Sequence, residues 1–244
     1  MGQWFHGRIY ERRADLTPDG SLLIYFANKI NKKTLSDPDY TYAWTAISKL
    51  PYFTALALWP KGDCWHGGGL FDDNRTVVLN HREDSATPHP KHKPKRLRII
   101  LKKDVCGEDD PLFSERLDRD GWHLDQEWKV ENRGYPDLFR TTQPEIRTKR
   151  RVTGPEMLRL RRSIHRLDYS EEFTLLDPGR SLSVILAQAS WADWDQQGRF
   201  VYAAGGKIMT GVLGDDGKLV QRVLLDLNPS KPVAIATPDW AASW

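Results

Sequence analysis

A glycine-rich loop from Gly62 to Gly69 carries the residue types best suited to chemistry in this chain. Its sequence, Gly-Asp-Cys-Trp-His-Gly-Gly-Gly, brings Asp63, Cys64 and His66 close together. All three are potential metal ligands, and His81 could meet His66 if the hairpin between them folds back. A zinc site usually shows a second tight pair of ligands, which is not evident here. We therefore expect no metal and no other cofactor, and keep a hydrolase, metal-dependent or with Asp63, His66 and His81 as acid–base groups, as an alternative.

The same loop also fits a contact surface or a structural turn. Consecutive glycines permit backbone angles that other residues rarely adopt, so the loop can approach a ligand or another chain closely. Trp65 could then plug the core, or it could contact a ligand together with Asp63 and His66. The loop lacks the Gly-Lys-Ser/Thr ending of a phosphate-binding loop, and the chain contains no Gly-x-Ser-x-Gly motif. No motif specifies a reaction, so a binding role is favoured over an enzymatic one.

Opposite charges gather in two neighbouring blocks of the chain. Nine acidic residues lie within 104–127, and nine basic residues lie within 140–166. Arginine makes bidentate contacts to phosphate and carboxylate, so the basic block predicts a surface for a polyanion, a nucleic acid or an acidic partner. The arginines that we expect to contact it are Arg147, Arg150, Arg151, Arg159 and Arg162. The alternative is that the two blocks pair internally, and the formal net charge of only +3 excludes a nucleic-acid packaging protein.

Short strands joined by polar turns are the elements that must position these residues. Asp-Gly or Gln-Gly turns precede apolar runs at Ser21–Tyr25, Phe200–Tyr202 and Leu219–Val220, and each run is short and rich in β-branched or aromatic residues. Two of the intervals between these turns are about 50 residues long, close to the length of one propeller blade. These intervals favour a repeat array such as a propeller, although the spacing along the whole chain is irregular. A barrel or sandwich without repeats remains an alternative.

One segment is expected to be helical, from about residue 155 to 167. Thr153 and Glu156 have the spacing of a capping box, with Pro155 in the first turn. Apolar residues then recur at helical spacing, at Met157, Leu160, Ile164 and Leu167. A strand is the alternative, because leucines and arginines also alternate in this segment.

Two stretches of the chain align with each other, ADLTPDGSLLIYF (Ala14–Phe26) and ADWDQQGRFVYAAGGKIM (Ala192–Met209). They resemble the inner hairpins of β-propeller repeats of the tryptophan–aspartate-repeat and TolB-like kind. With weaker copies elsewhere, the resemblance covers about 50 residues. It implies an all-β, propeller-like array of short antiparallel sheets with about four to five blades. It implies no catalysis, because propellers host binding and enzymatic functions alike.

The chain as a whole reads as a single propeller-like domain, residues 1–244. Propellers commonly close by pairing strands from both ends, so we expect Arg8–Arg12 and Val233–Ala236 in the same or adjacent blades. The longest apolar run, Tyr52–Trp59, is shorter than the roughly 20 residues of a membrane span, and no secretory signal is visible. Cys64 and Cys106 are expected as free thiols in the cytoplasm. The predicted function is a non-enzymatic binding or scaffold module for a protein partner, without membrane contact.

Overall fold

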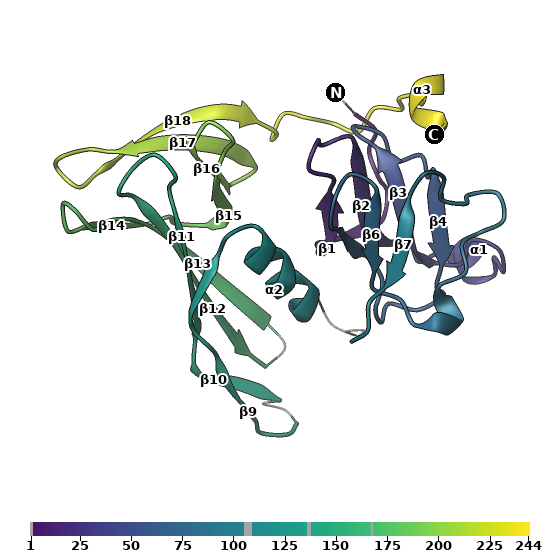
Figure 1. Ribbon diagram of the computed structural model, residues 1–244, viewed down its shortest axis with the longest axis horizontal. Coiled ribbons are helices and arrows are strands. Elements are labelled where there is room, and N and C mark those ends of the chain that lie inside the picture. The colour runs from purple at the N-terminus through teal and green to yellow at the C-terminus, as the bar shows by residue number, and fades with distance from the viewer. Residues whose placement is uncertain (1, 105–108, 136–137, 167) are drawn as a thin grey trace. The chain divides into compact units, whose positions relative to one another are not determined.

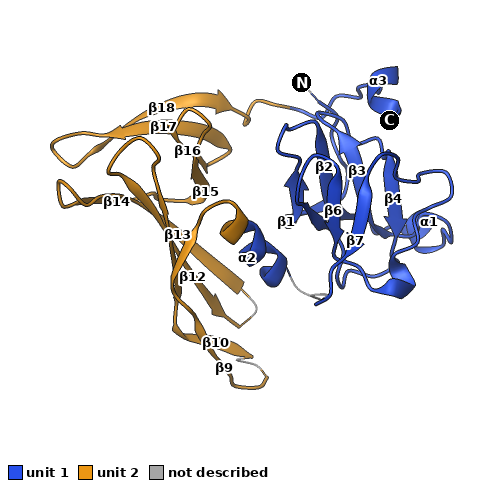
Figure 2. Cartoon of the chain, in the orientation of Figure 1, with its two compact units in different colours: residues 1–116, 231–244 blue, residues 117–230 orange. Residues whose placement is uncertain are grey.

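A computed structural model describes residues 2–104, 109–135, 138–166 and 168–244 (Figure 1). It is mostly β, with 45% strand and 9% helix, which confirms the all-β class. The chain divides into two compact units (Figure 2). Unit 1 comprises residues 1–116 and 231–244, and unit 2, residues 117–230, is inserted between these two segments. The single domain expected from the sequence stays a prediction.

The described residues of unit 1 form two sheets. The first is an antiparallel meander in chain order, β1 (Arg8–Leu16), β2 (Leu22–Asn28), β3 (Ala43–Lys49) and β4 (Ala57–Pro60). The second consists of β5 (Gly69–Phe71), β6 (Thr76–Leu79) and β7 (Arg98–Leu101), with β6 and β7 parallel. Unit 1 also has short helical turns, α1 (Lys32–Leu35), η1 (Glu83–Ser85) and α3 (Asp239–Ala242). The residues of helix α2 (Asp110–Arg119) are divided between unit 1 and unit 2.

The core of unit 1 is closed by the last residue of the chain. Ile24, Ile47, Trp59 and Phe71 are buried in one apolar cluster, and Trp244 packs against it. The Trp244 indole also donates to the backbone oxygen of Leu56 at 3.2 Å. The segment after unit 2 is therefore an integral part of unit 1.

Both ends of the chain lie together in unit 1. The Gln3 side chain donates to the backbone oxygen of Ile235 at 3.1 Å and to Thr237 Oγ1 at 2.6 Å. Residues 233–236 form no strand, so they do not pair with β1. The expectation that Arg8–Arg12 and Val233–Ala236 lie in the same or adjacent blades stays a prediction. No helix within the described ranges is long and apolar enough to span a membrane.

The described part of unit 2 forms a seven-stranded and a four-stranded sheet. The larger sheet consists of β8 (His123–Gln126), β9 (Lys129–Asn132), β10 (Phe139–Gln143), β11 (Glu145–Arg150), β12 (Met157–His165), β13 (Asp168–Asp177) and β14 (Leu182–Ile185). The smaller sheet is an antiparallel meander, β15 (Ala189–Trp194), β16 (Phe200–Ala204), β17 (Lys207–Leu213) and β18 (Leu219–Asp226). All strand pairs in both sheets are antiparallel.

The helix expected at 155–167 is wrong, because this segment forms strand β12 up to His165. Leu158, Leu160, Arg162 and Ile164 alternate on the buried face of the strand. Arg162 is buried in this row in place of an apolar residue. The apolar residues of the segment alone therefore match helical spacing better than strand alternation. Leu167, part of the expected helix, lies outside the described residues.

The two hairpins that carry the propeller resemblance have the expected turns. Gly20 and Gly198 have φ of 70° and 71°, a conformation that glycine adopts without a steric cost. Their N–H groups donate to the backbone oxygens of Thr17 and Asp195, both at 2.8 Å. β1 pairs with β2 across the first turn, and β15 pairs with β16 across the second. The local hairpin prediction is thus confirmed at both places.

Candidate functional site

The glycine-rich loop lines a pocket of about 500 Å³ in unit 1. The lining residues are Lys61, Asp63, Trp65, His66, Arg82, Asp84 and Ser85. The structure thus brings together the predicted residues Asp63, Trp65 and His66. Trp65 does not plug the core, since it is 61% exposed. Asp63 accepts a hydrogen bond from the Trp65 N–H at 2.8 Å and lies 3.3 Å from Lys61 Nζ. Ligand contact by this loop stays a prediction.

The loop is anchored to the strands beneath it by its backbone. Arg13, buried on β1, donates to the backbone oxygens of Cys64 at 2.9 Å and His66 at 2.5 Å. A Cβ on Gly68 would lie 2.2 Å from the Arg13 backbone oxygen, so only glycine fits there. The glycines therefore serve close packing of the loop. Cys64 is a free thiol, whereas Cys106 lies outside the described residues.

His81 has no ring nitrogen available to this pocket. The ring is fully buried, with Nδ1 2.8 Å from the Ser85 backbone oxygen and Nε2 2.7 Å from Thr45 Oγ1. Burial lowers the His81 pKa from 6.5 to about 4, so the ring is neutral near pH 7. Within the described ranges, no group of three or more His, Cys, Asp or Glu side chains is placed to hold a metal ion. The hydrolase alternative therefore lacks an accessible base at this position.

The basic block divides between the two faces of its sheet in unit 2. Arg147 and Arg162 are buried and bind the buried carboxylate of Glu145, at 2.7 and 2.8 Å. Arg147 also pairs with Asp118, and Arg162 lies 3.6 Å from Glu171. Burial raises the pKa of Glu145 against the opposing effect of Arg147. Both guanidinium groups thus form ion pairs inside the unit, and they are not accessible to a partner at the surface.

Arg150 and Arg159 take the opposite, outer face. Arg150 is exposed and lines a pocket of about 400 Å³ with His123. Arg159 is half-buried on β12, and Arg161 follows on the same face of that strand. Within the part of the chain that the structure describes, none of these three arginines forms an ion pair.

Arg151 lies at a second pocket of unit 2, about 460 Å³ in volume, which sequence reasoning did not find. The lining residues are Arg151, Glu156, Leu175, Trp194, Gln197, Arg199, Phe200, Thr210, Gly211, Val212, Leu213, Val220, Gln221 and Arg222. We call it the arginine pocket. The Trp194 and Phe200 rings meet edge to face with centroids 5.8 Å apart. The Arg151 guanidinium lies 5.7 Å from the Trp194 ring, and its Nε donates to the Gly198 backbone oxygen at 2.7 Å.

The charge at the arginine pocket is unbalanced. Three arginines face one carboxylate, Glu156, whose Oε1 is 3.2 Å from Arg151 Nη1. Arg199 pairs with Asp195 at 2.8 Å. Arg222 is exposed and has no ion-pair partner among the described residues. The lining of the pocket therefore includes one uncompensated guanidinium and, on the other face of the smaller sheet, an aromatic pair.

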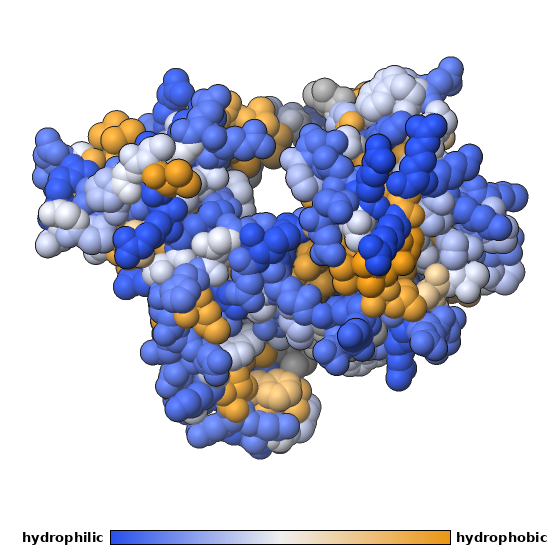
Figure 3. Space-filling model, viewed as in Figure 1, coloured by the Kyte–Doolittle hydropathy of each residue, from blue (hydrophilic) through white to orange (hydrophobic). Residues whose placement is uncertain are grey.

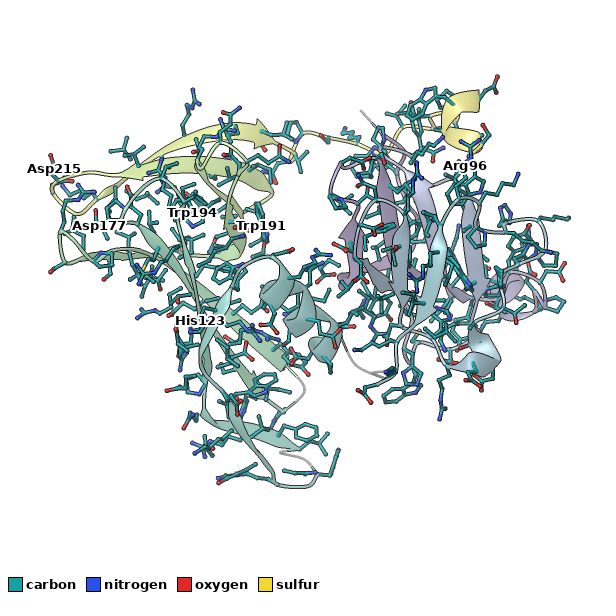
Figure 4. The ribbon with its side chains drawn as sticks, viewed as in Figure 1. Arg96, His123, Asp177, Trp191, Trp194 and Asp215 are labelled. Carbon is teal, nitrogen blue, oxygen red and sulfur yellow. The ribbon has the colours of Figure 1, made fainter. Side chains whose placement is uncertain are left out.

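An ion-pair bridge ties together the turns beside this pocket. Arg180 binds Asp177 at 2.7 Å and Asp215 at 2.8 Å (Figure 4). It also donates to the backbone oxygen of Leu213, a pocket residue, at 3.1 Å. The β13–β14 turn and the β17–β18 turn are thereby held next to each other, which positions the two sheets of unit 2.

Comparison of the chain with models of known protein families, with curated proteins and with solved structures finds no match.

Proposed function

We propose that the protein is a binding module, and that its arginine pocket takes an acidic segment of a protein partner. The observation that carries the proposal is the uncompensated charge of Arg222 at a pocket that Trp194 and Phe200 line from the other face of the smaller sheet. Guanidinium groups form strong, bidentate hydrogen bonds with carboxylates. The aromatic pair supplies apolar surface for a neighbouring side chain of the partner. An acidic segment with an apolar or aromatic residue matches both features.

The residue types at the pocket favour binding over catalysis. Its described lining contains one carboxylate and neither histidine nor cysteine. Acid–base and nucleophilic mechanisms draw most often on those side chains, activated by a neighbouring group. The single carboxylate, Glu156, is already engaged by Arg151.

We also propose that the sheets form a propeller-like array. Three sets of four consecutive strands, β1–β4, β11–β14 and β15–β18, each pair as antiparallel neighbours in chain order. That order is typical of a propeller blade. The sheet β5–β7 departs from it, because β6 and β7 are parallel. The three meanders support the resemblance of the hairpins to propeller repeats.

Isothermal titration with the end-blocked heptapeptide Glu-Leu-Glu-Phe-Glu-Leu-Glu tests the binding proposal. Saturable binding is expected, together with much weaker binding of the analogue in which every Glu is Gln. Arg222→Gln should weaken binding about three- to tenfold, the effect of losing one charge-assisted contact. Arg150→Gln, which removes an equal charge from the other pocket, is the matched control and should leave the affinity unchanged. Absence of saturable binding, or equal binding of the Gln analogue, would overturn the proposal.

A nucleic acid or another polyanion is a second candidate partner. Arg150, Arg159 and Arg161 share the outer face of the larger sheet in unit 2 and form no ion pair among the described residues. Such a surface should retain the protein on heparin in a salt-dependent manner. Arg159→Gln with Arg161→Gln should then abolish retention while Arg222→Gln preserves it. Elution of the wild type without retention at low salt would exclude this candidate.

A further inference from the structure

Strand β18 leaves one edge of the smaller sheet of unit 2 open. It is eight residues long and is the last strand of the sheet, and no other strand of the described residues pairs with its outer side. Natural proteins commonly protect such edges with proline, lysine or inward-pointing charges. The sequence of β18, Leu-Val-Gln-Arg-Val-Leu-Leu-Asp, contains no proline and no lysine. This edge is thus able to accept a further strand.

Apolar side chains on β18 are unusually exposed. Val220, Val223 and Leu225 are 69%, 45% and 52% exposed, and Val212, the cross-strand neighbour of Val220, is 72% exposed. Figure 3 shows apolar patches among hydrophilic side chains over β17 and β18. Val212 and Val220 share one face of the sheet with Arg222, whereas Val223 lies on the other. Exposed apolar surface commonly marks a site of interaction.

The hydrogen-bond pattern of the β17–β18 hairpin shows which backbone groups are open. The Gly214 N–H donates to the Lys218 oxygen at 2.9 Å and closes the turn. Hydrogen-bonded and non-hydrogen-bonded pairs alternate along an antiparallel ladder, so Val220 and Arg222 direct their backbone groups toward β17. Gln221 between them directs its N–H and C=O to the open side.

The open edge is continuous with the arginine pocket. Val220, Gln221 and Arg222 belong to β18 and also line that pocket. We propose that the acidic segment of the partner binds as an additional strand on the edge of β18. This inference rests on the proposed function and states how the segment is held. Main-chain hydrogen bonds to β18 provide affinity. Arg222 provides specificity, because it favours a carboxylate on the side chains of the segment that lie on its face of the sheet.

Charge favours an acidic segment over a second copy of this chain in the register that is centred on Arg222. If two β18 strands paired antiparallel about a two-fold axis, the register that sets Lys218 against Asp226 would also set Arg222 against Arg222 of the other copy. Like charges directly opposite each other destabilise a strand pair. A glutamate of an acidic segment in the same place is instead attracted to Arg222.

Two N-methylated forms of the heptapeptide test the added strand, because N-methylation removes a backbone donor and leaves the side chains unchanged. One form is methylated at its odd-numbered amides and the other at its even-numbered amides. Only one set of amides in an added strand faces β18. One form should therefore lose at least tenfold in affinity while the other stays within threefold of the parent peptide.

A variant of the protein tests the same contact from the other side. Gln221→Pro removes the outward N–H, at a position where an edge strand tolerates proline. Gln221→Ala is the control, since it loses the same side chain and keeps the N–H. The proline variant should bind at least tenfold more weakly than the alanine variant, with equal circular dichroism spectra.

The outcomes separate this inference from the proposed function. Charge-dependent binding of the parent peptide, with equal affinities for the two N-methylated forms, would overturn the added strand and preserve the acidic partner. Absence of binding by the parent peptide would overturn both. Concentration-dependent dimerisation that is lost in Gln221→Pro, without peptide binding, would assign the edge to a second copy of the chain.

Discussion

Acid should destabilise unit 1 through His81 in a defined pH window. The Ser85 carbonyl oxygen can only accept, so His81 Nδ1 carries the proton and Nε2 accepts from the Thr45 hydroxyl. The buried ring has a pKa of about 4 in the folded state, against 6.5 for an ordinary histidine. Between these values the unfolded chain binds a proton that the folded chain does not. Stability contributed by the neutral ring is thus complete above pH 6.5 and is lost as the pH falls toward 4.

The size of this effect follows from the two pKa values. Between pH 7.5 and 5.5 the unfolding equilibrium constant should rise roughly tenfold, a loss of about 1 kcal/mol. This range largely avoids the titration of ordinary carboxyl groups. Urea unfolding at both pH values measures the change, with His81→Gln as the comparison, because glutamine keeps a polar group without titrating. The variant should be less stable at pH 7.5 and should lose less stability on acidification.

Two results would contradict this reasoning. One is an equal loss of stability in the wild type and in His81→Gln on going from pH 7.5 to 5.5. The other is an NMR titration in which the His81 ring protons follow a pKa near 6.5. Either result would mean that water reaches the ring in the folded protein.

Further expectations concern backbone conformation and buried charge. Gly68→Ala should destabilise unit 1 by more than about 1 kcal/mol beyond Gly20→Ala, measured by urea unfolding. Both glycines have positive φ, but only a Cβ at Gly68 meets the Arg13 backbone oxygen, so equal losses would show that the loop shifts freely. Arg162→Ala should cost about 3–5 kcal/mol because it leaves Glu145 with one cation fewer in a buried network. A loss below 1 kcal/mol in the same assay would place that network in contact with water.

Local features of the fold could be predicted from the sequence because their causes are local. The hairpin turns at Gly20 and Gly198 follow from the need for positive φ at one residue. The error at 155–167 arose because Arg162 is buried by a partner, Glu145, seventeen positions earlier in the chain. Only the fold shows that this arginine belongs to an inward-facing row.

The arginine pocket could not be predicted from sequence patterns. Arg151, Arg199 and Arg222 come from three separate strand-and-turn segments and share no motif. The place of Trp194 beside Arg151 depends on how the two sheets of unit 2 meet. The open edge of β18 could not be predicted either, because an apolar run indicates a strand but does not show whether another strand covers its edge.

Hydrogen–deuterium exchange in the presence of the acidic heptapeptide tests the central claim most directly. Slower exchange is predicted along β18, including the Gln221 amide, with no change in the loop Gly62–Gly69. Protection confined to that loop, or no protection anywhere in unit 2, would contradict the assignment of the arginine pocket and its edge strand as the binding site.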